Sequence, residues 1–171
     1  MFKALFIGNE SLVAECVSLW RAAGHQVAAV VTRNAALRDR LSQEGVAVLA
    51  PGAPVPEGGY DWLFSIANLS LVPPDFLAAA RRGAINFHDG PLPRPAGLNA
   101  PVWALLEGES RHGITWHFIE GGIDEGRILL SRSFDIAPDD TALTLNTRAF
   151  QAALESFGDL VAKISADALQ P

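Results

Sequence analysis

The segment of residues 3–31, KALFIGNESLVAECVSLWRAAGHQVAAVV, decides the fold class of this chain. Its first part, Lys3–Ile7, is apolar after the lysine and predicts a strand. Ser11 is placed to cap a helix that runs to about Ala23, and residues 27–31 predict a second strand. Strand, helix and strand in this order form the unit from which parallel sheets covered by helices are built.

The same alternation continues along the chain and predicts an α/β fold, with a Rossmann-like, mostly parallel central sheet and helices on both faces. Asn34 is expected to cap one later helix, Gly45 to end it, and Asn99 to cap another. No internal repeat and no long linker divides the chain, so residues 1–171 are predicted to form a single domain. The expected helices are 35–43, 74–82, 101–106 and 141 to about 169, and the expected strands are 46–49, 62–66, 84–88, 114–118 and 128–134.

Composition and charge narrow the class of protein. Hydrophobic residues make up 49% of the 171 residues and charged residues 19%, a balance typical of a globular domain and not of a disordered chain. The net charge of −6 weighs against nucleic acid as a partner, because phosphate-gripping proteins normally carry a basic face. The N-terminal apolar run is too short for a signal peptide or a membrane span. We therefore expect a cytoplasmic protein without membrane contact, while the sequence predicts no oligomeric state.

The single cysteine, Cys16, cannot form an internal disulfide, and its place on the apolar side of the first helix predicts a core position. The first turn, Gly8-Asn9-Glu10-Ser11, has one glycine and a carboxylate. A dinucleotide-binding turn uses three glycines so that the backbone can approach a pyrophosphate, which a carboxylate would repel. We interpret Gly8 as a tight-turn residue, and a nicotinamide-dependent dehydrogenase is disfavoured.

Asn86 and His88 stand two residues apart at the end of a predicted strand, so both side chains are expected on the same face. Ligands of parallel α/β sheets sit at the carboxyl ends of the strands. An amide and an imidazole at such an edge can bind the negative oxygen that forms when a nucleophile attacks a carbonyl. The prolines of the following loop, residues 89–93, would stiffen one wall of this site.

The second candidate element is the glycine-rich segment 120–126, EGGIDEG. Its three glycines would let the backbone approach a ligand closely, and Asp124 within it could help to collect the proton that an attacking amine releases. Each element alone is more often a hydrogen-bonded loop anchor or a turn. Their joint order and spacing favour a catalytic site because they resemble the pattern of a known family.

Asn86-Phe87-His88, the loop 91–93, Gly113-Ile114-Thr115 and the segment 117–126 together resemble the folate-dependent formyltransferase family, over nearly the whole chain. The resemblance implies that the chain is a formyltransferase catalytic domain, compatible with a domain cut from a longer chain. It makes Asn86 and His88 the pair that polarises the formyl carbonyl, and Asp124 the partner of His88 that manages protons. Thr115 and His117 fall where the family has supporting polar residues.

The co-substrate implied by this resemblance is 10-formyltetrahydrofolate, and no metal is implied. In the family the folate ring lies between two loops, whose backbone groups pair with its polar edge and whose apolar side chains cover its faces. Core packing is the alternative interpretation of the aliphatic residues. The corresponding residues here are Leu69, Ser70, Leu71, Val72, Glu120, Gly121, Gly122 and Ile123.

The acceptor implied is a primary amine. Residues 86–93, 96–103 and 116–117 most resemble the formylation domains of nonribosomal peptide synthetases, in which the amine belongs to an aminoacyl group on the phosphopantetheine arm of a carrier protein. A sugar-nucleotide N-formyltransferase is the first alternative. A methionyl-tRNA formyltransferase fragment is another, against which the acidic charge and the end of the chain at Pro171 weigh. A catalytically silent folate-binding module is the alternative from a different class.

Overall fold

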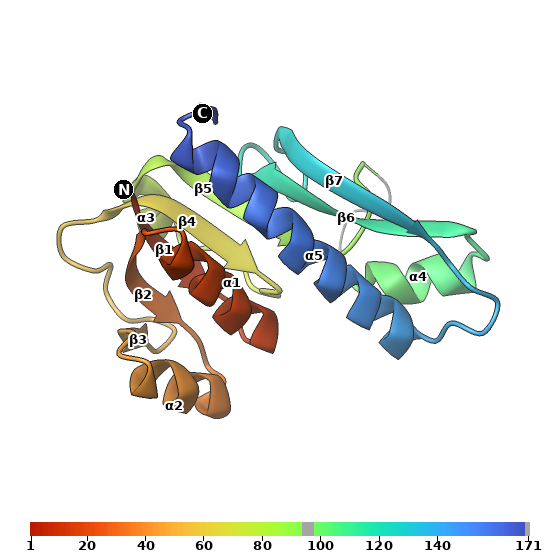
Figure 1. Cartoon of the computed structure of the whole chain (residues 1–171), viewed down its shortest axis with the longest axis horizontal. Helices are drawn as coiled ribbons and strands as arrows, with labels where there is room; N and C mark the ends of the chain where they lie inside the picture. The colour runs from red at the N-terminus through yellow and green to blue at the C-terminus, as the bar shows by residue number, and fades with distance from the viewer. Residues whose placement is uncertain (94–97, 170–171) are drawn as a thin grey trace. The chain divides into compact units, whose positions relative to one another are not determined.

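The computed structural model describes residues 1–93 and 98–169, and Figure 1 follows the chain from the first strand, in red, to the last helix, in blue. Ala96 and Gly97, which belong to the motif at 96–103, lie outside the described residues. The described chain alternates strands and helices, and it ends in one long helix.

Seven strands form one hydrogen-bonded sheet in the order β3-β2-β1-β4-β5-β6-β7. β1 pairs in parallel with β2 and with β4, β2 pairs in parallel with β3, and β6 and β7 are antiparallel. The predicted α/β class with a Rossmann-like, mostly parallel sheet is confirmed. The strands are β1 (Lys3–Ile7), β2 (Gln26–Val31), β3 (Val48–Leu49), β4 (Tyr60–Ile66), β5 (Ala80–His88), β6 (Arg111–Phe118) and β7 (Ile128–Asp135).

The helices are α1 (Ser11–Ala22), α2 (Ala35–Gln43), α3 (Pro74–Ala78), α4 (Ala100–Leu106) and α5 (Ala142–Ser165). Within the described residues, no helix has both the length and the apolar character that crossing a membrane requires. The expected cytoplasmic setting stays a prediction.

The chain forms two compact units. Unit 1 comprises Met1–Ile85 together with the chain from Val161 onward, and unit 2 comprises Asn86–Leu160. The prediction of a single domain stays a prediction.

The core of unit 1 is built around aromatic rings that are fully buried. Phe6 of β1 stacks on Phe64 of β4 at 5.1 Å between centroids, and the Trp20 ring of α1 meets Phe64 edge-on at 5.4 Å. Burying each such ring stabilises the fold by roughly 1.5–3 kcal/mol, which is why α1 packs on this part of the sheet. Cys16 is buried in the same core, as its position on the helix predicts.

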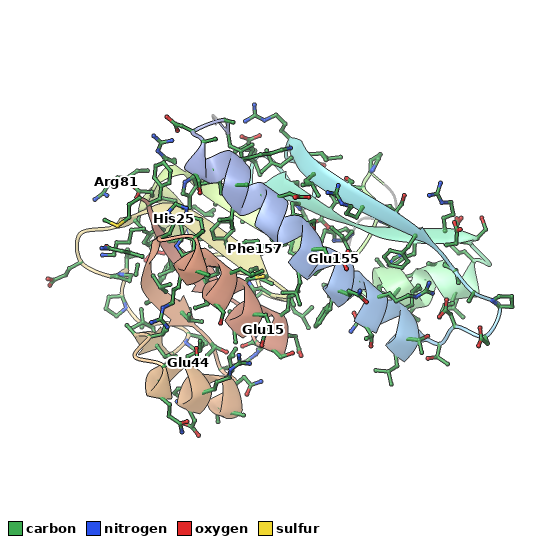
Figure 2. The ribbon with its side chains drawn as sticks, viewed as in Figure 1. Glu15, His25, Glu44, Arg81, Glu155 and Phe157 are labelled. Carbon is green, nitrogen blue, oxygen red and sulfur yellow. The ribbon has the colours of Figure 1, made fainter. Side chains whose placement is uncertain are left out.

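Polar side chains on the surface of unit 1 form hydrogen bonds and ion pairs between its elements. His25, after α1, bonds through Nε2 to the Ser165 hydroxyl at 2.8 Å. Arg40 of α2 pairs with Glu15 of α1 at 2.9 Å and with Glu44 at 3.1 Å, and Figure 2 labels both carboxylates and His25. These exposed pairs contribute about 1 kcal/mol or less each, because solvent screens them. The buried rings therefore dominate the stability of this unit.

The core of unit 2 joins α5 to β6. The indole Nε1 of Trp116 donates to the Ser156 hydroxyl at 2.9 Å, and the Trp116 ring lies 5.1 Å from Phe87 and 5.3 Å from Phe157. All of these side chains are buried. Phe87 of β5 points into this core. Because side chains alternate along a strand, the neighbouring residues Asn86 and His88 are directed to the other face of β5.

The structure confirms some of the predicted helix ends and differs from others. Asn34 caps α2 by accepting the amide of Leu37 at 3.2 Å, and Gly45 follows the helix with φ +74°, as predicted. The predicted cap at Ser11 is wrong: Ser11 is the first helical residue, and the capping position belongs to Glu10 without a side-chain bond. Asn99 occupies the capping position of α4, as predicted, but it is left-handed (φ +62°) and makes no side-chain capping bond.

The largest error concerns the helix predicted over 74–82, which ends at Ala78. The chain then becomes strand β5 at Ala80. Arg81 donates to the Gly58 carbonyl at 2.5 Å and Arg82 pairs with Asp167, and both partners are distant in sequence. Tertiary contacts therefore override the local helix propensity here. The other boundaries differ from the prediction by a few residues. The strand predicted at 46–49 has only two residues, β2, β4 and β6 begin earlier than predicted, and the last helix ends at Ser165.

Candidate active site

The site in unit 2 starts at the end of β5, where Asn86 and His88 face the same side, as expected. The Asn86 amide Nδ2 lies 3.2 Å from His117 Nε2, and His88 Nδ1 lies 3.6 Å from Asp124 Oδ2. The His88 side chain is only 5% exposed. The alternation of β5, with Ile85 and Phe87 buried on the opposite side, fixes these directions.

Asp124 lies between the two imidazoles. Its Oδ1 is 3.4 Å from His117 Nε2, its Oδ2 is 3.6 Å from His88 Nδ1, and its side chain is 9% exposed. These separations exceed the usual range for a strong hydrogen bond. The structure thus brings four of the residues singled out in the sequence, Asn86, His88, His117 and Asp124, into one cluster.

The glycine-rich loop holds Asp124 in an unusual backbone conformation. Asp124 has φ +57°, a left-handed conformation that non-glycine residues rarely adopt and that aspartate tolerates better than most. A Cβ on Gly126 would lie 1.8 Å from the Phe118 carbonyl oxygen, so only glycine allows the loop to approach the end of β6 this closely. The Glu125 carboxylate adds a bond from the Gly122 amide at 3.2 Å.

The contacts of His117 determine which ring nitrogen carries the hydrogen and whether the ring is charged. Its Nδ1 lies 2.8 Å from the Phe118 carbonyl oxygen, which can only accept, so Nδ1 carries the hydrogen. Burial lowers the pKa of His117, against the opposing influence of the Phe118 carbonyl and Asp124, and keeps the ring neutral near pH 7. Nε2 then presents a lone pair, which accepts one hydrogen of the Asn86 amide and faces the Asp124 carboxylate.

Thr115 supports the site from a different position. Its hydroxyl donates to the Gly90 carbonyl at 2.9 Å and accepts the Leu92 amide at 3.0 Å, and the side chain is fully buried. Thr115 therefore fixes the loop after His88, and within the described residues its hydroxyl makes no hydrogen bond to Asp124 or to the imidazoles. A Cβ on Gly90 would come within 2.9 Å of His88 Nε2, so the position of this loop controls the space around the imidazole.

Two groups beside the site, His112 and Asp89, were not predicted as site residues from the sequence. His112 Nε2 donates to the Asp89 carbonyl at 2.9 Å, and its buried Nδ1 has no hydrogen-bond partner among the described residues. Burial lowers the pKa of His112. Burial also raises the pKa of the Asp89 carboxyl, and the nearby His88 and His112 imidazoles oppose this rise. No local pattern distinguishes His112, since a histidine at the start of a strand is usually only a surface residue.

The residues predicted to contact folate divide between the two units. Leu69, Ser70, Leu71 and Val72 lie in unit 1, whereas Glu120, Gly121, Gly122 and Ile123 lie in unit 2. Leu69, Leu71 and Ile123 are 69%, 79% and 69% exposed, so core packing does not explain these aliphatic side chains. These three exposed side chains are apolar surface of their own units, suited to cover a flat ring, and the role of both sets with folate stays a prediction.

The loop in unit 1 has a fixed shape. The Asn68 carboxamide accepts the Ser70 amide at 3.2 Å and donates to the Ser70 carbonyl at 2.8 Å, which closes a short turn. Leu69 at its tip therefore has a defined place.

Within residues 1–93 and 98–169, no group of three or more His, Cys, Asp or Glu side chains is arranged to hold a metal ion.

Comparison with known proteins gives a consistent result. The sequence model of the family described as "Formyl transferase" matches residues 60–159, which include every member of the cluster around Asp124. The methionyl-tRNA formyltransferase of Anaeromyxobacter dehalogenans (strain 2CP-C) is 31% identical over 186 residues, covering 97% of this chain and 60% of that protein. The GDP-perosamine N-formyltransferase of Brucella melitensis is 32% identical over 104 residues, covering 61% of this chain and 40% of that protein.

The fold has solved counterparts. Glycinamide ribonucleotide transformylase 1 from Symbiobacterium toebii superimposes with a TM-score of 0.81 at 24% identity, over 94% of this chain and 86% of that one. The chain spans 60% or less of the length of the two curated relatives named above.

Proposed function

This chain belongs to the formyl transferase family, and on that premise we propose that it transfers a formyl group from 10-formyltetrahydrofolate to a primary amine. The observation that supports the proposal best is the Asp124 carboxylate held between His88 and His117, with the Asn86 amide beside them. An amine that attacks a carbonyl needs a donor for the developing oxygen charge and an acceptor for its own proton. The cluster contains both.

Asn86 and His88 are the proposed donors. When bound, 10-formyltetrahydrofolate supplies an activated formyl carbonyl. The Asn86 amide has two hydrogens, of which one is used by His117 Nε2, so the other is left to donate to the formyl oxygen. The His88 imidazole, nearly excluded from water, adds a second polarising group on the same face. Donors fixed in advance in a buried site stabilise the developing charge more strongly than water would.

Asp124 is the proposed proton acceptor. Its Oδ1 lies 3.4 Å from His117 Nε2. That nitrogen has one lone pair, which already accepts the Asn86 amide, so the neutral His117 ring has no further acceptor site. The Asp124 carboxylate can therefore take the proton that the attacking amine loses, directly or through a water molecule.

For the acceptor, we propose an aminoacyl group carried on the phosphopantetheine arm of a peptide-synthetase carrier protein. This rests on the motifs at 86–93, 96–103 and 116–117. An amino-sugar nucleotide is the second candidate, supported by the similarity to a GDP-perosamine N-formyltransferase. Initiator tRNA is supported by the first relative, although this chain spans only 60% of that protein.

The test is an assay with 10-formyltetrahydrofolate and four acceptors: a carrier-bound aminoacyl group, an amino-sugar nucleotide, glycinamide ribonucleotide and charged initiator tRNA. We expect transfer to the first, reduced by at least about 100-fold in His88→Ala, because one of the two polarising groups is lost. Formate release without any N-formyl product would indicate a hydrolase. Folate binding without either reaction would indicate a silent module and refute the proposed activity.

A further inference from the structure

The loop that follows His88 is held by two side chains of β6. His112 Nε2 donates to the Asp89 carbonyl at 2.9 Å, and the Thr115 hydroxyl donates to the Gly90 carbonyl at 2.9 Å. Each carbonyl belongs to the planar peptide group that joins its residue to the next one. The two bonds therefore fix two successive peptide groups, 89–90 and 90–91, directly after His88.

The first of these peptide groups controls the space beside the His88 imidazole. A Cβ on Gly90 would lie 2.9 Å from His88 Nε2 and 2.9 Å from the Cβ of Ala100 in α4. Gly90 therefore packs against both groups, and a rotation of the 89–90 peptide group would change the space left to the imidazole. Glycine restrains its own backbone less than any other residue, so the restraint has to come from the bonds at the peptide groups on its two sides.

The His112 ring is itself packed against β7 and linked through it to α5. The Phe134 ring, opposite His112 in the strand pair, meets it edge-on at 5.8 Å between centroids. The Arg148 guanidinium lies 5.2 Å from the centre of the Phe134 ring, donates to the Asp135 carbonyl at 2.7 Å and pairs with Asp140. His112 is 1% exposed, so its ring is held inside unit 2 and carries its single bond to the loop from a fixed position.

The environment of His112 also determines which ring nitrogen carries its hydrogen. A carbonyl oxygen can only accept, so the bond to Asp89 requires the hydrogen on Nε2. Nδ1 is buried and has no hydrogen-bond partner among the described residues. Burial lowers the pKa of His112 against the opposing influence of the Asp89 carbonyl and carboxylate, and His88 and Arg148 lower it further. His112 is therefore a neutral ring with one donor, and the Asp89 carbonyl uses that donor.

We propose that His112 is a positioning residue for formyl transfer, which holds the His88 imidazole in place through the Asp89 carbonyl and the 89–90 peptide group. The inference rests on the proposed role of His88 in polarising the formyl carbonyl. A displacement of about 1 Å at a reacting group can lower a rate by about 10²-fold, so a bond that only supports such a group can affect catalysis strongly. His112 and Thr115 then act as two anchors on adjacent peptide groups.

The kinetic test compares His112→Leu with His112→Gln and with the matched control His25→Leu. Leucine removes the donor, whereas the glutamine amide can still donate to the Asp89 carbonyl. His25, in unit 1, is also a buried imidazole with a hydrogen bond, to the Ser165 hydroxyl at 2.8 Å. We expect His112→Leu to lower kcat by about 10–100-fold with KM values changed by less than about twofold, and His112→Gln to recover most of the loss. His25→Leu should lose stability and keep the kcat of the wild type per folded molecule.

A second measurement does not depend on catalysis. The chain has four histidines, so NMR spectra of the imidazole rings contain four sets of signals, which single substitutions assign. We expect His112→Leu to shift or broaden the ring signals of His88, and His25→Leu to leave them unchanged. In the wild type, the nitrogen signals of His112 should be those of a neutral ring with its hydrogen on Nε2.

Unchanged His88 signals in His112→Leu would overturn the proposal, as would an equal fall of kcat in His25→Leu, since His112 would then act only through the stability of the fold. Should His112→Leu fail to fold, a wild-type His112 ring with its hydrogen on Nδ1 would still refute the proposal, because Nε2 could not donate to the Asp89 carbonyl. Perturbed His88 signals in a protein that transfers no formyl group would refute the proposed function and still support the positioning of His88 by His112.

Discussion

His117 Nε2 lies 3.4 Å from Asp124 Oδ1, and the bond of His117 Nδ1 to the Phe118 carbonyl leaves the Nε2 lone pair to accept the Asn86 amide. Both side chains are almost fully buried. Burial lowers the pKa of His117, so the ring is neutral near pH 7. Because its one lone pair is already used, Asp124 is the group of this pair that can receive the amine proton.

Asp124→Asn removes the carboxylate charge while keeping the left-handed backbone, since asparagine adopts φ near +57° as readily as aspartate. We expect kcat to fall by about 10²–10⁴-fold, the usual contribution of a positioned proton acceptor, with little change in thermal stability. Steady-state kinetics and circular dichroism measure the two effects. Asp139→Asn, at an exposed carboxylate, is the matched control and should leave kcat unchanged. Equal activity of both variants would remove Asp124 from the mechanism.

Thr115→Val keeps the shape of the side chain and deletes the hydroxyl that bonds to the Gly90 carbonyl and the Leu92 amide. The buried Gly90 carbonyl and the half-buried Leu92 amide lose their partner, and a buried unsatisfied group costs about 1–3 kcal/mol. The loop after His88 should become less well fixed, so kcat should fall together with stability. Thr115→Ser retains the hydroxyl and should recover most of the loss. If serine and valine behave alike, the hydroxyl does not hold the loop.

Gly126→Ala would place a Cβ at 1.8 Å from the Phe118 carbonyl oxygen, so the loop that carries Asp124 would have to move. We expect a loss of more than about 2 kcal/mol in the free energy of unfolding, or a displaced loop with little activity. Gly158→Ala is the matched control: nothing lies within 4 Å of its added Cβ, and the position is inside α5. This control should gain roughly 0.5–1 kcal/mol from helix propensity. Chemical denaturation and activity assays compare the two.

The stability of the protein should fall as the pH is lowered from 7 toward 5. Burial lowers the pKa values of His25, His112 and His117 from 6.5, so the unfolded chain takes up protons before the folded chain does. Their full contribution is present above pH 6.5 and is lost progressively below it, at up to about 4.1 kcal/mol per pH unit for three sites. The raised pKa of the Asp89 carboxyl acts in the opposite direction at still lower pH.

Thermal melts at pH 7.5 and 5.5 measure this dependence. His112→Gln removes one of the three groups while an amide can still donate to the Asp89 carbonyl. The variant should therefore lose a smaller part of its stability between the two pH values than the wild type does. An identical pH dependence would contradict the assignment of His112 as a buried neutral histidine.

The sequence by itself predicted the α/β class, the order of the strands and helices along the chain, and the four residues Asn86, His88, His117 and Asp124 that the structure brings together. Their catalytic role stays a prediction. Alternation of apolar and polar residues along β5 placed Asn86 and His88 on one face, because side chains of a strand alternate strictly. The capping bond of Asn34 and the turn at Gly45 were also predictable, since they depend only on neighbouring residues.

Only the tertiary structure decided where α3 ends and which polar groups act together. The chain from Ala80 onward is a strand because it pairs in the sheet between β4 and β6, which no local pattern contains. The buried position of His112 likewise depends on a contact with a distant residue, the Asp89 carbonyl. Local interactions determine the secondary structure of a segment, whereas burial and hydrogen bonds between distant segments determine protonation and partner choice.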